Sequence, residues 1–161
     1  ALDKSNLQLN FTTLNLDDLI QTNIQNIKLA LDEIAGSCTF NNSLNSANVK
    51  GDSYHLNNVI SNILDNSIKY SDGDLKIAVD LKLENQYYVL SFADNGIGMS
   101  SKTKDLAFDK FFRAESGNIH NRKGFGLGLS YVKKIVEAHS GTVKLGSQLD
   151  KGTTLTIKLP R

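Results

Sequence analysis

A run of alternating apolar and polar residues in the middle of the chain limits the possible folds more than any other feature. Its apolar members occupy every second position: Leu75, Ile77, Val79, Leu81 and Leu83. This spacing predicts a β-strand with one buried face, because successive side chains point to opposite sides of a sheet. The stretch 88–92 repeats the alternation after a turn at Glu84 and Asn85, which predicts a hairpin. We therefore expect a sheet that is covered on one side.

Other patterns predict the remaining strands and the layer that covers them. Further strands are expected at 7–11, twice within 37–50, and as a hairpin over 143–159. Helical spacing of apolar residues predicts helices at about 16–34, 53–71 and 127–139. Asn15 and either Asp52 or Ser53 are the expected helix N-caps, and Gly36 and Gly141 are the expected stops. The predicted fold class is α+β, a two-layer sandwich whose mixed, mostly antiparallel sheet carries three helices on one face.

Length and composition fit one domain that covers residues 1–161. The net charge of +1 gives no reason to expect binding to nucleic acid or to a membrane surface. The single Cys38 excludes an internal disulfide framework and suits a reducing compartment. No run is long and apolar enough to span a bilayer. Because the chain begins without Met, we expect it to be a piece of a longer protein.

The predicted helix at 53–71 carries an unusual polar face. Asn58, Asn62, Asn66 and Lys69 share one arc, although Asn is a poor helix former. Amide oxygens can coordinate a hard cation, and a Lys one turn further on can contact phosphate. The row therefore fits a site for Mg²⁺ and the phosphates that it bridges. An Asn-rich solvated face explains the same row equally well, because the whole chain is rich in Asn.

The stretch DNGIGM follows the second strand of the central hairpin, so Asp94 ends a buried strand. A carboxylate accepts a hydrogen bond from the amine of adenine and repels the oxygen that guanine carries at the same place. Gly96 and Gly98 permit positive φ and a close approach of the backbone. The alternative interpretation is a tight Asx turn between strand and loop.

The long irregular segment 94–124 is a candidate lid or binding loop, and it leads into GFGLGLS. Gly124, Gly126 and Gly128 lie at the expected start of a helix, where free N–H groups can bind phosphate. Their spacing does not match the dinucleotide fingerprint, the P-loop or the protein-kinase glycine loop. A flexible hinge is the alternative interpretation of these glycines.

The motif FDKFFR lies within the same irregular segment. Phe108, Phe111 and Phe112 fall on one face of a helical turn, which predicts a small apolar cluster that anchors the loop. The guanidinium of Arg113 could then reach a γ-phosphate when the loop closes.

The order NxxxNxxKY, DNGIGM, FDKFFR, GFGLGLS resembles the N, G1, F and G2 boxes of sensor histidine kinases. The chain is similar to their catalytic, ATP-binding domain, within the wider group of gyrase, heat-shock chaperone and mismatch-repair ATPases. This resemblance implies the Bergerat sandwich, ATP and Mg²⁺ as ligands, and a junction at residues 1–6 with a dimerisation and phosphoacceptor domain. It also implies a cytoplasmic domain of a homodimeric parent, which in many family members is an inner-membrane sensor.

The resemblance implies a role for each matching residue. Asn66 would be the Mg²⁺ ligand and Asp94 would bind the adenine amine, while Asn62, Lys69 and Arg113 would carry the catalytic contacts to the phosphates. The nucleotide-binding set implied by the boxes is Asn62, Asn66, Lys69, Tyr70, Asp94, Gly96, Gly98, Arg113, Gly124, Gly126, Leu127 and Gly128. The domain would donate the γ-phosphate to a histidine on the separate helical domain, and an Asp of a response regulator receiver domain would accept it later.

Two further expectations concern what the chain does not do. ATP-hydrolysing relatives carry Glu at the position of Asn62, and an amide cannot act as a general base. Transfer is therefore favoured over hydrolysis, against the alternative of a gyrase-type ATPase. None of His55, His120 and His139 has the acidic, Arg-containing context of a phosphoacceptor. A degenerate module that binds nucleotide or a partner without kinase activity remains the other alternative.

Overall fold

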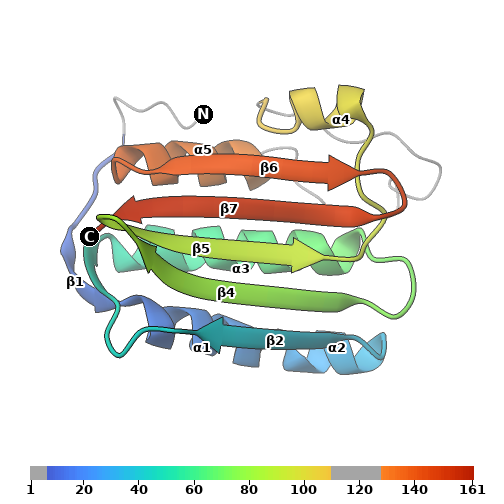
Figure 1. The fold of residues 1–161 in the computed structure, drawn as a ribbon, viewed down its shortest axis with the longest axis horizontal. Helices are drawn as coiled ribbons and strands as arrows, with labels where there is room; N and C mark the ends of the chain where they lie inside the picture. Colours follow the sequence, from blue (N-terminus) through green and yellow to red (C-terminus); the bar gives the residue numbers. More distant parts are fainter. Residues whose placement is uncertain (1–6, 110–127) are drawn as a thin grey trace.

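The structure is a computed structural model that describes residues 7–109 and 128–161. Figure 1 shows a sheet in front and a layer of helices behind it. Among the described residues, the main sheet has five strands in the order β2-β4-β5-β7-β6. Its members are β2 (Ser37–Asn42), β4 (Lys76–Glu84), β5 (Tyr87–Asp94), β7 (Gly152–Pro160) and β6 (Thr142–Gln148). Only the β2–β4 pair of this sheet is parallel, so the prediction of a mixed, mostly antiparallel sheet is confirmed.

Within residues 7–109 and 128–161, the helical layer consists of four helices: α1 (Leu16–Asn26), α2 (Lys28–Glu33), α3 (Ser53–Lys69) and α5 (Gly128–Ala138). A short helix, α4 (Ser101–Leu106), lies beside the β6 edge of the sheet. A separate two-stranded sheet pairs β1 (Thr12–Asn15) with β3 (Asn48–Gly51). In the described part of the chain, no helix is long and apolar enough to cross a membrane.

The core forms where the apolar face of the sheet meets the apolar stripes of the helices. Ile77, Val79 and Leu81 of β4 are buried, as their alternation predicts. They belong to one cluster with the buried side chains of α3: Leu56, Val59, Ile60, Ile63 and Leu64. The buried face of β4 therefore packs against the layer that α3 helps to form.

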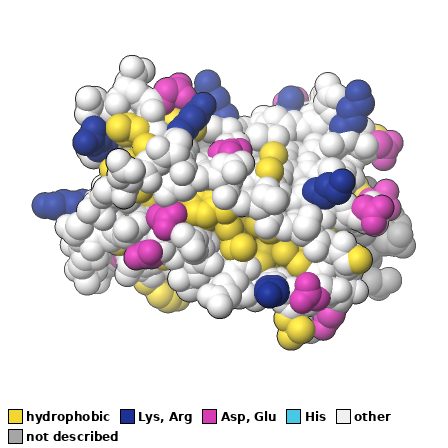
Figure 2. Space-filling model, turned by 60° about the horizontal axis from the view of Figure 1, so that its bottom comes forward, with side chains coloured by type: hydrophobic (Ala, Val, Ile, Leu, Met, Phe, Trp, Pro, Cys, Tyr) yellow, Lys and Arg dark blue, Asp and Glu magenta, His cyan; other side chains and the backbone are white. Residues whose placement is uncertain are grey.

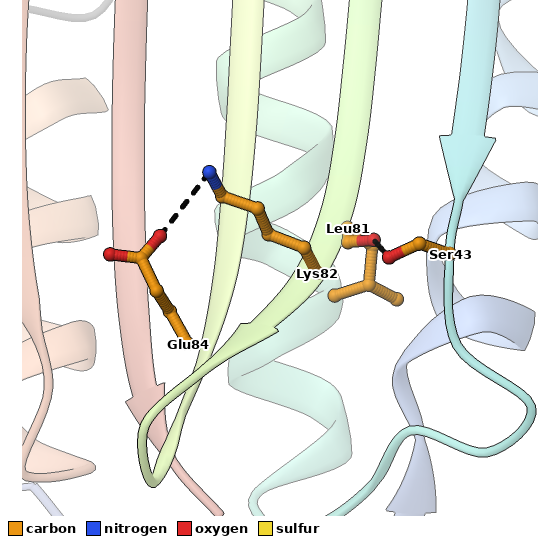
Figure 3. Close-up of polar contacts among 4 residues, drawn as sticks. All are labelled: Ser43, Leu81, Lys82 and Glu84. Atoms are coloured by element: carbon orange, nitrogen blue, oxygen red, sulfur yellow. Dashed lines mark hydrogen bonds and ion pairs between the residues drawn. The ribbon is translucent and has the colours of Figure 1, made fainter.

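Among the described residues, no helix covers the opposite face of the sheet (Figure 1). Lys82 and Glu84 point out of β4 on this face and form an ion pair of 3.2 Å (Figure 3), in which each side chain is at least half exposed. Just after β2, the N–H and the hydroxyl of Ser43 both donate to the carbonyl oxygen of Leu81, at 3.3 and 3.5 Å. Ser43 thus continues the parallel pairing by one residue beyond the end of β2.

Apolar side chains also reach the surface on the lower side of the molecule. Figure 2 shows this side, where an apolar band runs between patches of polar atoms. Helix α2 lies on this side in Figure 1. It carries the exposed side chain of Leu29 (73% exposed), and its C-cap residue Ile34 is also exposed (37%).

Several predicted elements differ from the structure. The strand expected at 7–11 is wrong: the N–H of Asn10 donates to the Asp52 carboxylate at 2.8 Å, and the Phe11 ring stacks on His139. These contacts hold the segment without a ladder of backbone hydrogen bonds. The helix expected at 16–34 is divided at Ile27, whose ψ of −1° ends α1. The break lies directly after Asn26, a residue with low helix propensity.

Two glycines stop the helices for a reason other than the predicted one. The left-handed residues are Ala35 (φ 53°) and Ser140 (φ 61°), one position before each glycine. Gly36 and Gly141 then donate their N–H groups to carbonyl oxygens one turn back, at 2.8 and 2.9 Å. A Cβ at Gly141 would overlap the carbonyl oxygen of Lys158, so glycine is needed for close packing on β7.

Candidate functional site

The asparagine row of α3 lies along the boundary with α5. Asp52 caps α3 by accepting the N–H of His55 at 2.9 Å, as one of the two expected caps. Asn58 donates to the hydroxyl of Tyr131 on α5 at 3.5 Å. Asn66 lies two turns further along α3, against Gly128, the first residue of α5. A Cβ added to Gly128 would be 3.4 Å from the side-chain amide nitrogen of Asn66. Asn58, Asn62 and Asn66 are all half-buried, so the row is not a freely solvated face.

Asp94 is held between β5 and α3. One carboxylate oxygen accepts the N–H of Gly96 at 2.9 Å, and the other accepts the hydroxyl of Ser67 at 2.8 Å. The first contact is the Asx turn that the sequence left open as an alternative. The second contact joins the end of β5 to the last turns of α3. Asp94 remains half-buried and retains acceptor capacity, because an ionised carboxylate can accept about four hydrogen bonds.

The loop after Asp94 is clamped on two sides. On one side, the N–H of Ile97 donates to the carbonyl oxygen of Tyr70 at 2.9 Å, at the C-cap of α3. On the other side, the Ile97 carbonyl accepts the N–H of Asp150 at 2.7 Å, in the turn between β6 and β7. A Cβ at Gly96 would lie 2.7 Å from the Tyr70 carbonyl oxygen, so this loop needs glycine for its close approach to α3.

Gly98 also holds this loop in place, through its close packing against the hairpin of β6 and β7. Its φ is +67°, and a Cβ there would overlap the carbonyl oxygen of Gln148. Gly152 (φ +114°) brings the hairpin close to the loop from the other side, since a Cβ added there would overlap the carbonyl oxygen of Asp94. The two glycines let the loop and the final hairpin lie in direct backbone contact.

The motif that contains Phe108 follows a helix that sequence patterns did not predict. Helix α4 begins at a Ser100 cap, whose hydroxyl oxygen accepts the N–H of Thr103 at 3.2 Å. Phe108 is half-buried and packs against the core, and the ammonium of Lys133 on α5 lies 5.7 Å from its ring centroid. The predicted anchoring cluster is therefore supported for Phe108.

The remaining lid residues lie outside the described part of the chain. This applies to Phe111, Phe112, Arg113, His120, Arg122, Lys123, Gly124, Gly126 and Leu127. The sequence assigned no definite role to His120, Arg122 and Lys123, and the roles expected for the other six residues stay predictions.

The structure brings the other predicted site residues to one end of the sandwich. Asn66, Lys69 and Tyr70 belong to the last turn of α3 and its C-cap, with Gly128 beside Asn66. Asp94, Gly96 and Gly98 reach the same end through the loop after β5. Asn62 lies one turn before Asn66 on the same face of the helix.

Sequence reasoning missed three residues that build this end. Ser67 fixes Asp94, Gly152 allows the hairpin to approach, and the hydroxyl oxygen of Ser147 accepts the N–H of Met99 at 2.8 Å. One signal was available for Ser67: it continues the apolar stripe of Ile60, Ile63 and Leu64, where a small polar residue needs a partner.

The two described histidines are engaged in structural contacts. The Nδ1 atom of His55 is hydrogen-bonded to the Tyr131 hydroxyl at 2.6 Å. His139 is buried, and its Nε2 accepts the N–H of Asp52 at 2.9 Å while its Nδ1 lies 2.7 Å from the Ile135 carbonyl oxygen. Burial lowers the pKa of His139 against the opposing effects of that carbonyl and of Asp52. With both ring nitrogens occupied, His139 has no lone pair with which to accept a phosphoryl group.

Comparison with known proteins supplies the family. The model described as "Histidine kinase-, DNA gyrase B-, and HSP90-like ATPase" matches residues 51–161, which is more than half of the chain. The chain belongs to this family. The family resemblance expected from the four boxes is thereby confirmed, and the matched residues of this ATPase family include the whole of α3 and every strand from β4 onward.

Particular members of the family resemble the chain over nearly its whole length. The sensor protein RprX of Bacteroides fragilis is 36% identical over 160 residues, which are 98% of this chain and 31% of that protein. The chain spans about a third of the length of the curated relatives that it matches.

Solved structures support the fold. The catalytic domain of the histidine kinase ThkA superposes with a TM-score of 0.82 at 22% identity, covering 94% of this chain and 96% of that one. Full-length ShkA in complex with AMPPNP gives a TM-score of 0.82 at 19% identity, covering 96% of this chain and 32% of that one. These likenesses confirm the predicted α+β sandwich of the Bergerat type.

Proposed function

We propose that residues 1–161 form one catalytic domain that binds Mg²⁺–ATP and donates the γ-phosphate to a histidine on a separate helical domain. The observation that carries this proposal is the hydrogen bond between Ser67 and Asp94, which joins the end of β5 to the turn of α3 that also carries Asn66. In this proposal, the amide oxygen of Asn66 on α3 serves a cation and the carboxylate of Asp94 at the end of β5 serves an amine of the same ligand. The ATPase family to which the chain belongs, and the AMPPNP complex of ShkA, support a nucleotide as that ligand.

In this proposal the amide oxygen of Asn66 would hold Mg²⁺, an ion that proteins usually bind through one or two side chains together with substrate phosphates. The residues present fit such a site, since Asn66 is half-buried beside the glycine that opens α5. The bound ion would neutralise charge on the phosphates. Lys69 contacts a phosphate, Tyr70 packs at the nucleotide, and Asp94 accepts the adenine amine. Gly96 and Gly98 shape the wall beside the base.

The lid residues complete the proposed site. Arg113 serves the γ-phosphate, and Leu127 and the three glycines of GFGLGLS close over the phosphates, with Gly128 as the one glycine within the described residues. Catalysis then rests on positioning and charge neutralisation, as in phosphoryl transfer generally. Asn62 orients the phosphates but cannot deprotonate water, which favours transfer to a histidine over hydrolysis.

The proposed partners follow from this chemistry. The phosphoryl group passes first to the dimerisation and phosphoacceptor domain of the same homodimeric protein, and then to an Asp of a response regulator receiver domain. The domain would act in the cytoplasm, where ATP is available.

The test of nucleotide binding is calorimetry with ADP in the presence of Mg²⁺ or of EDTA. We expect Mg²⁺ to tighten binding to the wild type, and Asn66→Ala to bind no more tightly in Mg²⁺ than in EDTA. Asp65→Ala is the matched control, because Asp65 is an exposed neighbour on the same turn. Equal enhancement by Mg²⁺ in Asn66→Ala and wild type would show that the metal assignment is wrong.

The test of transfer uses ATP labelled at the γ-phosphate. We expect label on the helical domain when that domain and this one are combined, and no label on residues 1–161 alone. Label on residues 1–161 alone would contradict the separate acceptor. Nucleotide binding without any transfer to the helical domain would identify a binding module that lacks kinase activity.

A further inference from the structure

The buried hydroxyl of Ser67 is the polar exception on the apolar stripe of α3. Only 7% of the residue is exposed, and a hydroxyl at such a depth needs a hydrogen-bond partner. Two acceptors lie near it: the carbonyl oxygen of Ile63 at 3.4 Å and a carboxylate oxygen of Asp94 at 2.8 Å. A hydroxyl has one hydrogen, so the shorter contact takes it. Ser67 therefore donates to Asp94.

This donation fixes the plane of the Asp94 carboxylate. The terminal torsion of an aspartate is broad, so one hydrogen bond alone leaves the group free to turn. Here each oxygen has its own donor from a different element, Gly96 in the loop and Ser67 on α3, at 2.9 and 2.8 Å. The acceptor positions that remain therefore point in directions set by α3.

A fixed carboxylate discriminates between purines at position 6 of the ring. An amine at that position donates to the carboxylate, whereas an oxygen there meets a second acceptor and is repelled. A carboxylate that can turn weakens both the attraction to the amine and the repulsion of the oxygen. It can rotate away from the oxygen, and it is no longer oriented toward the amine.

We propose that Ser67 is a positioning residue that sets base selectivity, by holding Asp94 to favour a 6-aminopurine over a 6-oxopurine. This inference rests on the proposed nucleotide-binding function. Ser67 also directly follows Asn66 in the chain. The same helical turn therefore holds Asp94, through Ser67, and carries Asn66, so the proposed base-binding and metal-binding groups keep a constant separation.

The experiment compares ADP with inosine diphosphate, whose base carries an oxygen in place of the amine. Affinities of both nucleotides are measured by calorimetry in Mg²⁺ for the wild type, Ser67→Ala, Ser67→Thr and Ser71→Ala. Ser71 is the matched control, because its hydroxyl donates to the Ile68 carbonyl oxygen at 2.8 Å and not to Asp94.

We expect Ser67→Ala to lower the affinity for ADP about fivefold, the equivalent of one hydrogen bond, and to leave the affinity for inosine diphosphate equal or higher. The ratio of the two affinities therefore falls in Ser67→Ala, returns in Ser67→Thr and stays unchanged in Ser71→Ala. A variant that is merely less folded loses both affinities equally, so its ratio would not change.

An unchanged ratio in Ser67→Ala, in a protein whose wild type prefers ADP, would overturn this inference and leave the proposed function intact. A wild type that binds neither nucleotide would overturn the proposed function and the inference with it.

Discussion

Acidification is expected to destabilise the domain through His139. This buried ring connects three segments: its Nε2 accepts the N–H of Asp52, its Nδ1 is hydrogen-bonded to Ile135, and Phe11 stacks on it with centroids 4.8 Å apart. Protonation would place a hydrogen on Nε2 and turn the acceptor toward Asp52 N–H into a second donor. The native state therefore requires the neutral ring.

The sign and size of the effect follow from the pKa of His139. Burial lowers this pKa below the ordinary value of 6.5, with an opposing contribution from Asp52 and a supporting one from His55. Stability from the neutral ring is complete above 6.5 and is lost as pH falls below 6.5 through the lower native pKa. The loss can reach about 1.4 kcal/mol per pH unit, because one proton binds on unfolding.

Urea unfolding at pH 7.5, 6.5 and 5.5 measures this effect. We expect little change between the first two values and a loss of up to about 1 kcal/mol between the last two. His139→Gln cannot titrate, so its stability should be flat over the same range, after a fall of about 2–3 kcal/mol at pH 7.5 from the altered contacts to Asp52 and Phe11.

His55→Asn is the control: because burial is the main cause of the lowered pKa of His139, this variant should still lose stability below pH 6.5. The reasoning is refuted if His139→Gln loses stability below pH 6.5 as steeply as the wild type does.

Three substitutions test other parts of the fold, each by urea unfolding at pH 7.5. Gly152→Ala should cost at least about 2 kcal/mol and weaken ADP binding, because φ is +114° and the new Cβ overlaps the Asp94 carbonyl; wild-type stability would contradict the close approach. Asn15→Ala should cost about 1 kcal/mol, since its side chain accepts the N–H groups at the start of α1 at 2.8 and 3.3 Å. Lys82→Ala should change stability by less than about 0.5 kcal/mol, because its ion pair is exposed, and a larger loss would show that the pair is stronger than its exposure suggests.

Local patterns predicted the elements that local physics determines. The alternation in β4 shows directly which side chains are buried, and Asn15 and Asp52 cap their helices with short side chains that reach the first free N–H groups. The asparagine row predicted a special face on α3, and its half-buried position beside α5 agrees with that prediction.

Features that depend on residues far away in the sequence could not be predicted from local patterns. Nothing near Ser37 indicates that β2 pairs in parallel with β4, since the partner strand begins beyond a whole helix. The left-handed residues Ala35 and Ser140 stand one position before the glycines that local rules would choose, and Gly141 is required by the backbone of β7 packed against it. The contact of Ser67 with Asp94 spans 27 positions and has no local signature beyond one small polar residue.

The position of β7 has a consequence for how the domain is made. This strand lies between β5 and β6 in the sheet, yet it is synthesised after the other four strands of the sheet that the described residues form. Until residues 152–160 leave the ribosome, β5 keeps an unpaired inner edge and the apolar side chains of Leu155, Ile157 and Leu159 are missing from the core. The nascent chain therefore cannot complete its sheet in the order of synthesis, and the edge of β5 stays exposed to pairing with other chains until β7 is available.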